Sequence, residues 1–148
     1  MAPSQTSIES PRSPLELDDA VEWFERRSGE LVLLEERSLD DVRAEVREFE
    51  ERVQEHLRTF DIPAPPPAAS RTDLSKVRAS LISDHACFAI SVAQLDWFLR
   101  IVEQEDHGGH RQALGQYGRV FAEALRRHRN DERAYLARIA DRAAEISP

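Results

Sequence analysis

The stretch of residues 73–106 carries two apolar stripes at helical spacing and constrains the fold more than any other part of the chain. The first stripe consists of Leu74, Val77, Leu81, Phe88, Val92, Leu95, Leu99 and Val102. The second, on an adjoining face, consists of Ile82, Ala86, Ile90, Ala93, Trp97 and Ile101. Because so wide an apolar surface is typical of a helix surrounded by partners, we predict the central helix of a bundle, about 50 Å long.

The remaining sequence favours an all-α fold in one domain. The chain has 148 residues, only five glycines, and no alternating runs typical of strands. We predict a disordered tail over residues 1–13 and an antiparallel four-helix bundle over 14–148, ending in a long helical hairpin. The expected helices cover about 15–36, 39–60, 73–106 and 110–146, with a proline-rich linker at 62–70.

Local signals set the expected helix boundaries. Ser38 is a predicted N-cap, and Gly108 and Gly109 predict a tight reversal between the last two helices. One segment stays ambiguous. The run from Leu31 to Leu34 fits the end of the first helix or a short buried strand, since periodicity cannot separate the two over four residues.

Composition narrows the classes of protein that fit. No run of 18 uncharged apolar residues and no signal-peptide pattern occur, and the single cysteine rules out an internal disulfide framework, so we expect a cytoplasmic protein without a membrane contact. Residues 1–60 carry 16 acidic residues and 8 arginines, whereas residues 107–148 carry 5 acidic residues and 8 arginines. We interpret this distribution as electrostatic attraction between the acidic first helices and the basic last helix within one bundle.

Familiar catalytic motifs are missing, so no catalytic residue is predicted, but one set of polar residues passes a geometric test. If the chain reverses at Gly108, then His85 falls level with Glu132, one turn from His128. Imidazoles and carboxylates on facing helices are ligands that divalent transition metals prefer. The predicted metal ligands are His85, His128, Glu132 and Asp84.

The sequence also bears on the surroundings and the role of this layer. Ser28 and Gly29 are expected to lie near it and to leave room for a ligand. The alternative to a metal site is a polar layer that fixes the register of the helices, with Asp84 and Arg133 as an ion pair.

Three functional hypotheses follow. The leading one is a non-enzymatic interaction or regulatory bundle without a cofactor, which self-associates or binds another protein through Trp97, Ile101 and Ile90. The second is a metal-binding bundle with redox or hydrolytic chemistry at the predicted ligands. The third is weak nucleic-acid binding, which the acidic net charge of −8 disfavours, through a basic patch formed by Arg126, Arg127, Arg129 and Arg133.

Overall fold

The computed structural model of the chain describes residues 14–33, 36–67 and 71–146, and the predicted tail lies outside them. These residues form four α-helices: α1 (Pro14–Val32), α2 (Leu39–Thr59), α3 (Arg71–Gln104) and α4 (Gly108–Ile146). No strand occurs among them. The all-α prediction is therefore confirmed.

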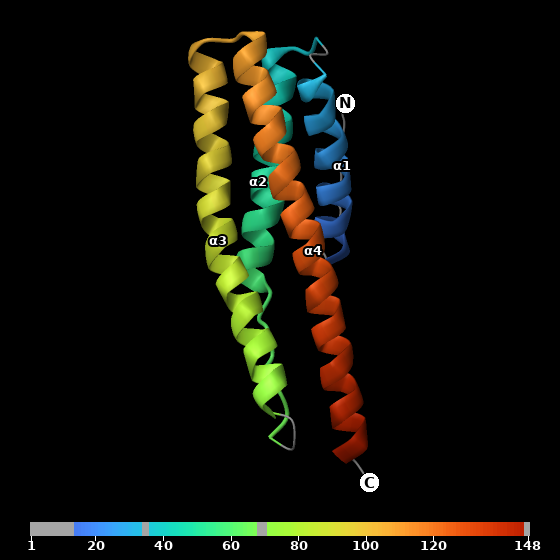
Figure 1. Cartoon of the computed structure of the whole chain (residues 1–148). Helices are drawn as coiled ribbons and strands as arrows, with labels where there is room; N and C mark the ends of the chain where they lie inside the picture. Colours follow the sequence, from blue (N-terminus) through green and yellow to red (C-terminus); the bar gives the residue numbers. More distant parts are fainter. Residues whose placement is uncertain (1–13, 34–35, 68–70, 147–148) are drawn as a thin grey trace, which may run out of the picture.

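The helices form an antiparallel bundle in which chain neighbours are also neighbours in space (Figure 1). The helix α1 packs on α2 and α4, and α3 packs on α2 and α4, so the last helix closes the ring. The two long helices α3 and α4 continue well past the ends of α1 and α2 (Figure 1). The predicted four-helix bundle with a long C-terminal hairpin is confirmed.

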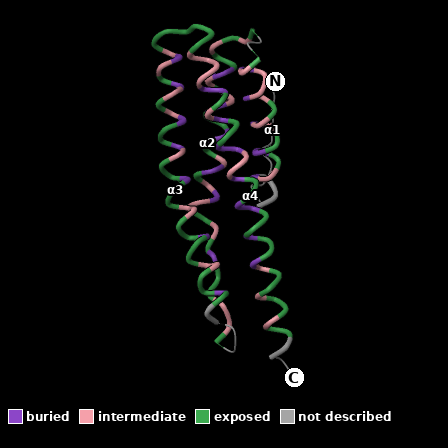
Figure 2. Tube along the Cα trace, viewed as in Figure 1, coloured by how far each residue is buried: buried purple, intermediate pink, exposed green. Residues whose placement is uncertain are grey.

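The prediction that residues 73–106 form the central helix is wrong. The helix α3 lies at the outside of the bundle, and its first apolar stripe is buried from Leu74 to Val102 while most of the second is exposed (Figure 2). At about 100° per residue the two stripes point in nearly opposite directions rather than to adjoining faces. Two neighbouring helices can therefore cover only one of them.

The helix boundaries follow the predicted signals in part. The hydroxyl of Ser38 accepts a hydrogen bond from the backbone N–H of Asp41 (3.0 Å), as expected of an N-cap. The first helix ends at Val32, and Leu33 lies in a turn, so this helix is shorter than predicted. The strand alternative fails for the described part of the run, and Leu34 lies outside the described residues.

The reversal between α3 and α4 lies just before the two glycines instead of at them. The helix α3 ends at Gln104 and α4 begins at Gly108, so both glycines belong to the first turn of α4. The Nδ1 atom of His107 accepts a hydrogen bond from the N–H of Gly109 (3.1 Å). This imidazole thus satisfies a backbone donor that the helix leaves without an intrahelical partner.

The proline-rich segment packs against the projecting part of the hairpin. Ile62 is buried in a small apolar cluster with Leu74, Leu81 and Tyr135. The hydroxyl of Tyr135 donates to the carbonyl of Pro63 (2.6 Å), and Arg78 donates to the carbonyl of Ile62 (3.0 Å). The segment is therefore held to both α3 and α4 through its backbone.

Glycines allow α1 and α4 to approach closely. An ideal Cβ on Gly118 would lie 2.7 Å from the hydroxyl oxygen of Ser28 and 2.8 Å from the ring of Phe24. Ser28 therefore lies beside Gly118, and ten residues of helix, about 15 Å, separate Gly118 from His128. The prediction that Ser28 and Gly29 lie near the polar layer is wrong.

The helix α3 also has an unusual combination of length and apolar composition. From Asp73 to Gln104 it is long and apolar enough to cross a membrane, by length and composition alone. Charged residues on this helix are few and widely spaced, so they lower its hydropathy little. The same length and composition also occur in helices of water-soluble bundles, so this property does not establish a membrane span.

Candidate metal centre

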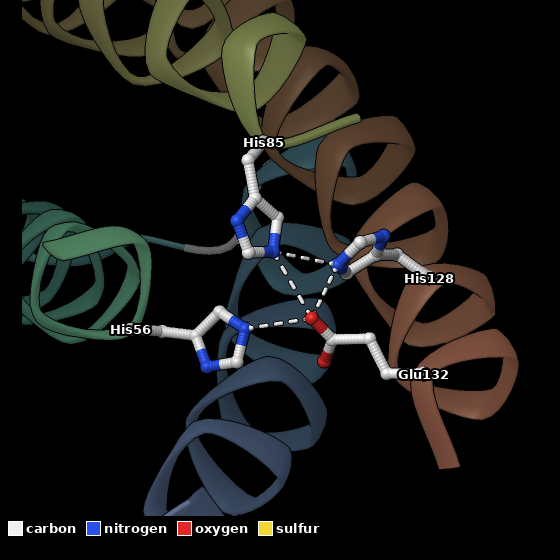
Figure 3. Close-up of side chains that lie close together, drawn as sticks. All are labelled: His56, His85, His128 and Glu132. Atoms are coloured by element: carbon white, nitrogen blue, oxygen red, sulfur yellow. Dashed lines mark hydrogen bonds and ion pairs between the residues drawn. The ribbon is translucent and has the colours of Figure 1, made fainter. Parts of the chain in front are cut away.

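Four side chains from three helices meet in one layer of the bundle (Figure 3). His56 comes from α2, His85 from α3, and His128 and Glu132 from α4. Each offers one ligand atom, and these four atoms lie within 4.8 Å of one another. Figure 3 shows the three rings turned toward the carboxylate from different sides.

The helical period explains why these side chains converge. His128 and Glu132 are one turn apart on α4, and both are buried between Leu125 and Tyr135. On α3, His85 lies between the buried Leu81 and Phe88, and on α2, His56 follows the buried Val53 by three residues. Each ligand thus sits on or beside the core-facing stripe of its helix.

One carboxylate oxygen is the common point of contact. The Oε2 atom of Glu132 lies 2.7 Å from Nε2 of His128, 3.0 Å from Nε2 of His85 and 3.2 Å from Nε2 of His56. The Nε2 atoms of His85 and His128 are themselves 3.0 Å apart. All three histidines therefore direct the same ring nitrogen into one small space.

Hydrogen bonds alone do not satisfy this arrangement. If all three Nε2 atoms carry a proton and donate to Glu132, then His85 and His128 face each other N–H to N–H at 3.0 Å. If either Nε2 is unprotonated, its lone pair faces the carboxylate oxygen at 3.0 Å or less. Because Glu132 is ionised, no placement of protons on the three imidazoles makes all four contacts favourable at once.

A cation between the four atoms would make every contact favourable, because it accepts all four lone pairs. Around a tetrahedral Zn²⁺ with bonds of about 2.0 Å, neighbouring ligand atoms lie ~3.3 Å apart. The four contacts between these atoms span 2.7 to 3.2 Å, and the whole set spreads over 4.8 Å, so small movements of the rings, outward for the close pairs and inward for the distant ones, accommodate such an ion. The donor set and its spacing therefore fit a transition metal.

Carboxylates and an arginine orient two of the ligands from outside. The Nδ1 atom of His128 lies 2.9 Å from Oδ2 of Asp84. The other oxygen of Glu132, Oε1, accepts a hydrogen bond from Arg129 (2.6 Å), which also donates to Asp18 of α1 (3.0 Å). Partners of this kind fix ring and carboxylate orientation in metal sites.

The electrostatics keep the carboxylate charged. Burial opposes ionisation of Glu132, but hydrogen bonds from the three histidines and Arg129 outweigh it and hold its pKa far below the usual range. Burial also opposes protonation of His128, yet its hydrogen bonds to Glu132 and Asp84 raise the pKa of this imidazole. The centre thus offers a negative charge that is already in place for a cation.

Apolar rings enclose the centre. The ring of His56 stacks on Phe60 with centroids 5.0 Å apart, and His128 meets Phe88 edge to face at 5.1 Å. The exposed fraction of the side chain is 1% for His128 and Glu132 and 15% for His85. Solvent therefore reaches this layer mainly on the side of His85.

The structure brings together all four predicted ligands and adds one that was missed. His85, His128 and Glu132 are in direct contact, and Asp84 lies behind His128 in a supporting position. The missed candidate ligand is His56, because the geometric test compared only the last two helices and His56 lies on α2. His56 follows the buried Phe49 by seven residues, which is two helical turns, and this spacing was the signal in the sequence that His56 lies on the core face.

The predicted ion pair between Asp84 and Arg133 is wrong. Arg133 pairs with Asp18 and donates to Asn130 (3.0 Å), while Asp84 contacts His128. The predicted level of α3 against α4 was correct to about one helical turn, since His128 contacts Asp84 and His85. The error lay in the direction of the Arg133 side chain, which faces α1.

The predicted basic patch does not form one surface. Arg129 is buried against Glu132, Arg126 pairs with Glu25, and Arg133 pairs with Asp18, while Arg127 is exposed. The acidic first helix therefore neutralises much of the charge of the basic last helix. Of the predicted interface, Trp97 and Ile90 are exposed and Ile101 is half-buried.

Comparison of the chain with models of known families, with curated proteins and with solved structures gives no match.

Proposed function

We propose that this protein binds one divalent first-row transition metal ion in the core of its bundle. The ligands are the Nε2 atoms of His56, His85 and His128 and a carboxylate oxygen of Glu132. The observation that carries the proposal is the convergence of these atoms within 4.8 Å in an arrangement that hydrogen bonds alone leave unsatisfied.

The donor set narrows the choice of metal. Three imidazoles and one carboxylate suit Zn²⁺, Fe²⁺, Co²⁺ or Mn²⁺, whereas Mg²⁺ and Ca²⁺ prefer oxygen ligands alone. The single cysteine, Cys87, is exposed and lies outside this set, so no thiolate favours a softer ion such as Cu⁺. A bound ion would supply a positive charge that joins α2, α3 and α4.

Four protein ligands and low exposure favour a structural or regulatory ion. Closed sites with four protein ligands are typical of structural metals, whereas catalytic ions keep an open position for water or substrate. Binding to the folded chain alone stabilises it in proportion to the logarithm of the metal concentration. We therefore propose a bundle whose stability responds to metal, with the ion in a structural or regulatory role rather than the redox or hydrolytic role of the second hypothesis.

The test is the metal content of protein purified without a histidine tag or chelator. We expect about one ion per chain by elemental analysis, and its loss in His56→Ala and in His128→Ala. His110→Ala, at the far end of the bundle, is the matched control and should retain the ion. Circular dichroism of each variant separates loss of the ligand from loss of the fold.

Reconstitution provides a second measurement. Adding Co²⁺ to metal-free protein should give the visible absorption typical of a four-coordinate site, and His56→Ala should abolish it. If the folded wild-type protein contains no metal and takes up neither Zn²⁺ nor Co²⁺, the proposal is wrong. The layer would then be a polar device that fixes the register of the helices.

A further inference from the structure

The solvent-facing side of α3 carries large apolar side chains that neither neighbouring helix covers. Ile82, Ile90 and Trp97 have exposed fractions of 44%, 61% and 59%. Between them lie the exposed Ala86, Ala89 and Ala93. We call these six residues the outer face of α3.

The outer face lacks charge in a chain of which 32% of the residues are charged. Between residues 79 and 97 the acidic residues of α3 are Asp84 and Asp96, and both lie off the outer face, Asp84 against His128 of α4 and Asp96 against Arg47 of α2. Contiguous exposed apolar surface of this kind marks a site of interaction. Because the outer face points nearly opposite to the buried stripe, a partner can reach it without displacing α2 or α4 (Figure 2).

The spacing of side chains on the outer face is symmetric about its own middle. The midpoint of this face lies between Ala89 and Ile90. Ile82 and Trp97 are equally far from this midpoint on opposite sides, and so are Ala86 and Ala93. An antiparallel copy of α3 therefore places Trp97 opposite Ile82, and Ala86 opposite Ala93. Trp97 and Ile82 then meet at the two ends, Ala86 and Ala93 lie between them, and Ile90 packs against Ala89 of the other copy near the middle.

We propose that two copies of the chain associate through the outer face of α3, antiparallel about a two-fold axis near Ala89 and Ile90. A two-fold interface uses the same patch on both subunits, and the symmetric spacing of this face meets that requirement. Each copy carries a net charge of −8, so copies repel each other over most of their surface. The uncharged outer face allows contact without burying an unpaired charge.

The available area fits a weak but specific dimer. With about 200 Å² for a full side chain of this size, Ile82, Ile90 and Trp97 expose roughly 350 Å² together. Adding the alanines and the rim gives roughly 600 Å² per copy, or about 1,200 Å² in total, the lower limit for stable interfaces. We expect a dissociation constant on the order of micromolar.

Sedimentation equilibrium of the full chain tests the association. The wild type should be a dimer at about 100 μM and dissociate on dilution through the micromolar range. Ile90→Glu should be monomeric at all these concentrations, with an unchanged circular dichroism spectrum, because its side chain faces solvent. Leu33→Glu is the matched control: Leu33 is 76% exposed but lies away from α3, so this variant should remain dimeric.

Cysteine cross-linking tests the orientation. In a Cys87→Ser background, Ile90→Cys should form an intermolecular disulfide under mild oxidation, because the two positions face each other across the axis. Ile82→Cys in the same background should not, since antiparallel pairing separates the two positions by about 22 Å, beyond the ~7 Å limit for a disulfide. Equal cross-linking at both positions would overturn the antiparallel arrangement.

Three outcomes overturn the proposal altogether. The first is a wild type that stays monomeric at about 100 μM, and the second is a dimer that Ile90→Glu leaves intact. The third is a monomer that floats with phosphatidylcholine vesicles and loses this property in Ile90→Glu, which would assign the outer face to lipid. Metal content is independent of all these readouts, so none of these results bears on the proposed metal site.

Discussion

The Nδ1 atom of His128 lies 2.9 Å from the Oδ2 atom of Asp84, across the contact between α4 and α3. The carboxylate therefore holds the ring so that its Nε2 atom points at the other ligands. The Asp84 side chain is 40% exposed, so water can take its place but cannot fix the ring equally well.

We expect Asp84→Ala to weaken metal binding by about tenfold to a hundredfold, the usual effect of losing a carboxylate behind a ligating histidine. Competition with a chromophoric chelator measures the change in affinity. Asp96→Ala removes the same charge from the same helix three turns away and should leave the affinity unchanged. Equal affinities in all three proteins would show that Asp84 has no role in orienting His128.

Arg129 joins the centre to α1 through Glu132 and Asp18. Replacing Arg129 with Met leaves a carboxylate that is 1% exposed without the guanidinium that pairs with it, and we expect a loss of about 3–5 kcal/mol in the free energy of unfolding of metal-free protein. Urea denaturation in the presence of a chelator measures it. Arg133→Met, at an exposed partner of Asp18, should cost less than 1 kcal/mol.

The loss caused by Arg129→Met should shrink when metal is present, because the ion compensates part of the charge of Glu132. A loss of the same size with and without Zn²⁺ would contradict the proposed coordination of this carboxylate.

Glu50 makes stability depend on pH. Burial, reinforced by Asp96, raises the pKa of its carboxyl from 4.5 to about 7, and its Oε2 atom is buried without a hydrogen-bond partner. Between these pH values the folded chain binds more protons than the unfolded chain, so the free energy of unfolding falls as pH rises from about 4.5 to 7.

We expect Glu50→Gln to stabilise the protein on the order of 3 kcal/mol above pH 8 and to have little effect near pH 4.5. Urea denaturation at the two pH values measures the difference. Glu51→Gln, at the exposed neighbouring position, is the control and should change stability by a few tenths of a kcal/mol. A gain that is independent of pH would mean that charge burial is not the cause.

The contact between Gly118 and Ser28 predicts opposite effects for two glycine substitutions. Gly118→Ala places a methyl group 2.7 Å from the Ser28 hydroxyl, and we expect a loss of about 1–3 kcal/mol although alanine favours a helix. Gly29→Ala meets nothing within 4 Å and should stabilise the protein by about 0.5–1 kcal/mol. Thermal denaturation of both variants at one pH compares them directly.

Much of the fold could be predicted because helical spacing and capping residues are local signals. Ser38 correctly predicted the start of α2, and the apolar stripe correctly predicted α3. The reversal near Gly108 predicted that His85 and His128 lie close together, as they do. When two adjacent helices are antiparallel, the length of the connection between them determines which of their side chains lie at the same height along the bundle. This is why three of the four candidate ligands could be found from the sequence.

The remaining features depend on contacts between distant segments. The proline segment separates His56 from α3, so no count of residues places it level with His85. The position of Ser28 follows from how closely Gly118 lets α1 approach α4, which helix periodicity does not describe. The exposure of Trp97 likewise depends on which two helices flank α3, and spacing along one helix cannot reveal that.

His56 and Glu132 are separated by 76 residues along the chain. We expect the centre to assemble only when α2 and the second half of α4 have come together, and hence late in folding, because contacts between distant segments carry a large loop-closure cost. Interactions that form after the rate-limiting step slow unfolding and leave the folding rate nearly unchanged. A bound ion would thus act on the lifetime of the native bundle, and a chelator would shorten that lifetime without impeding refolding.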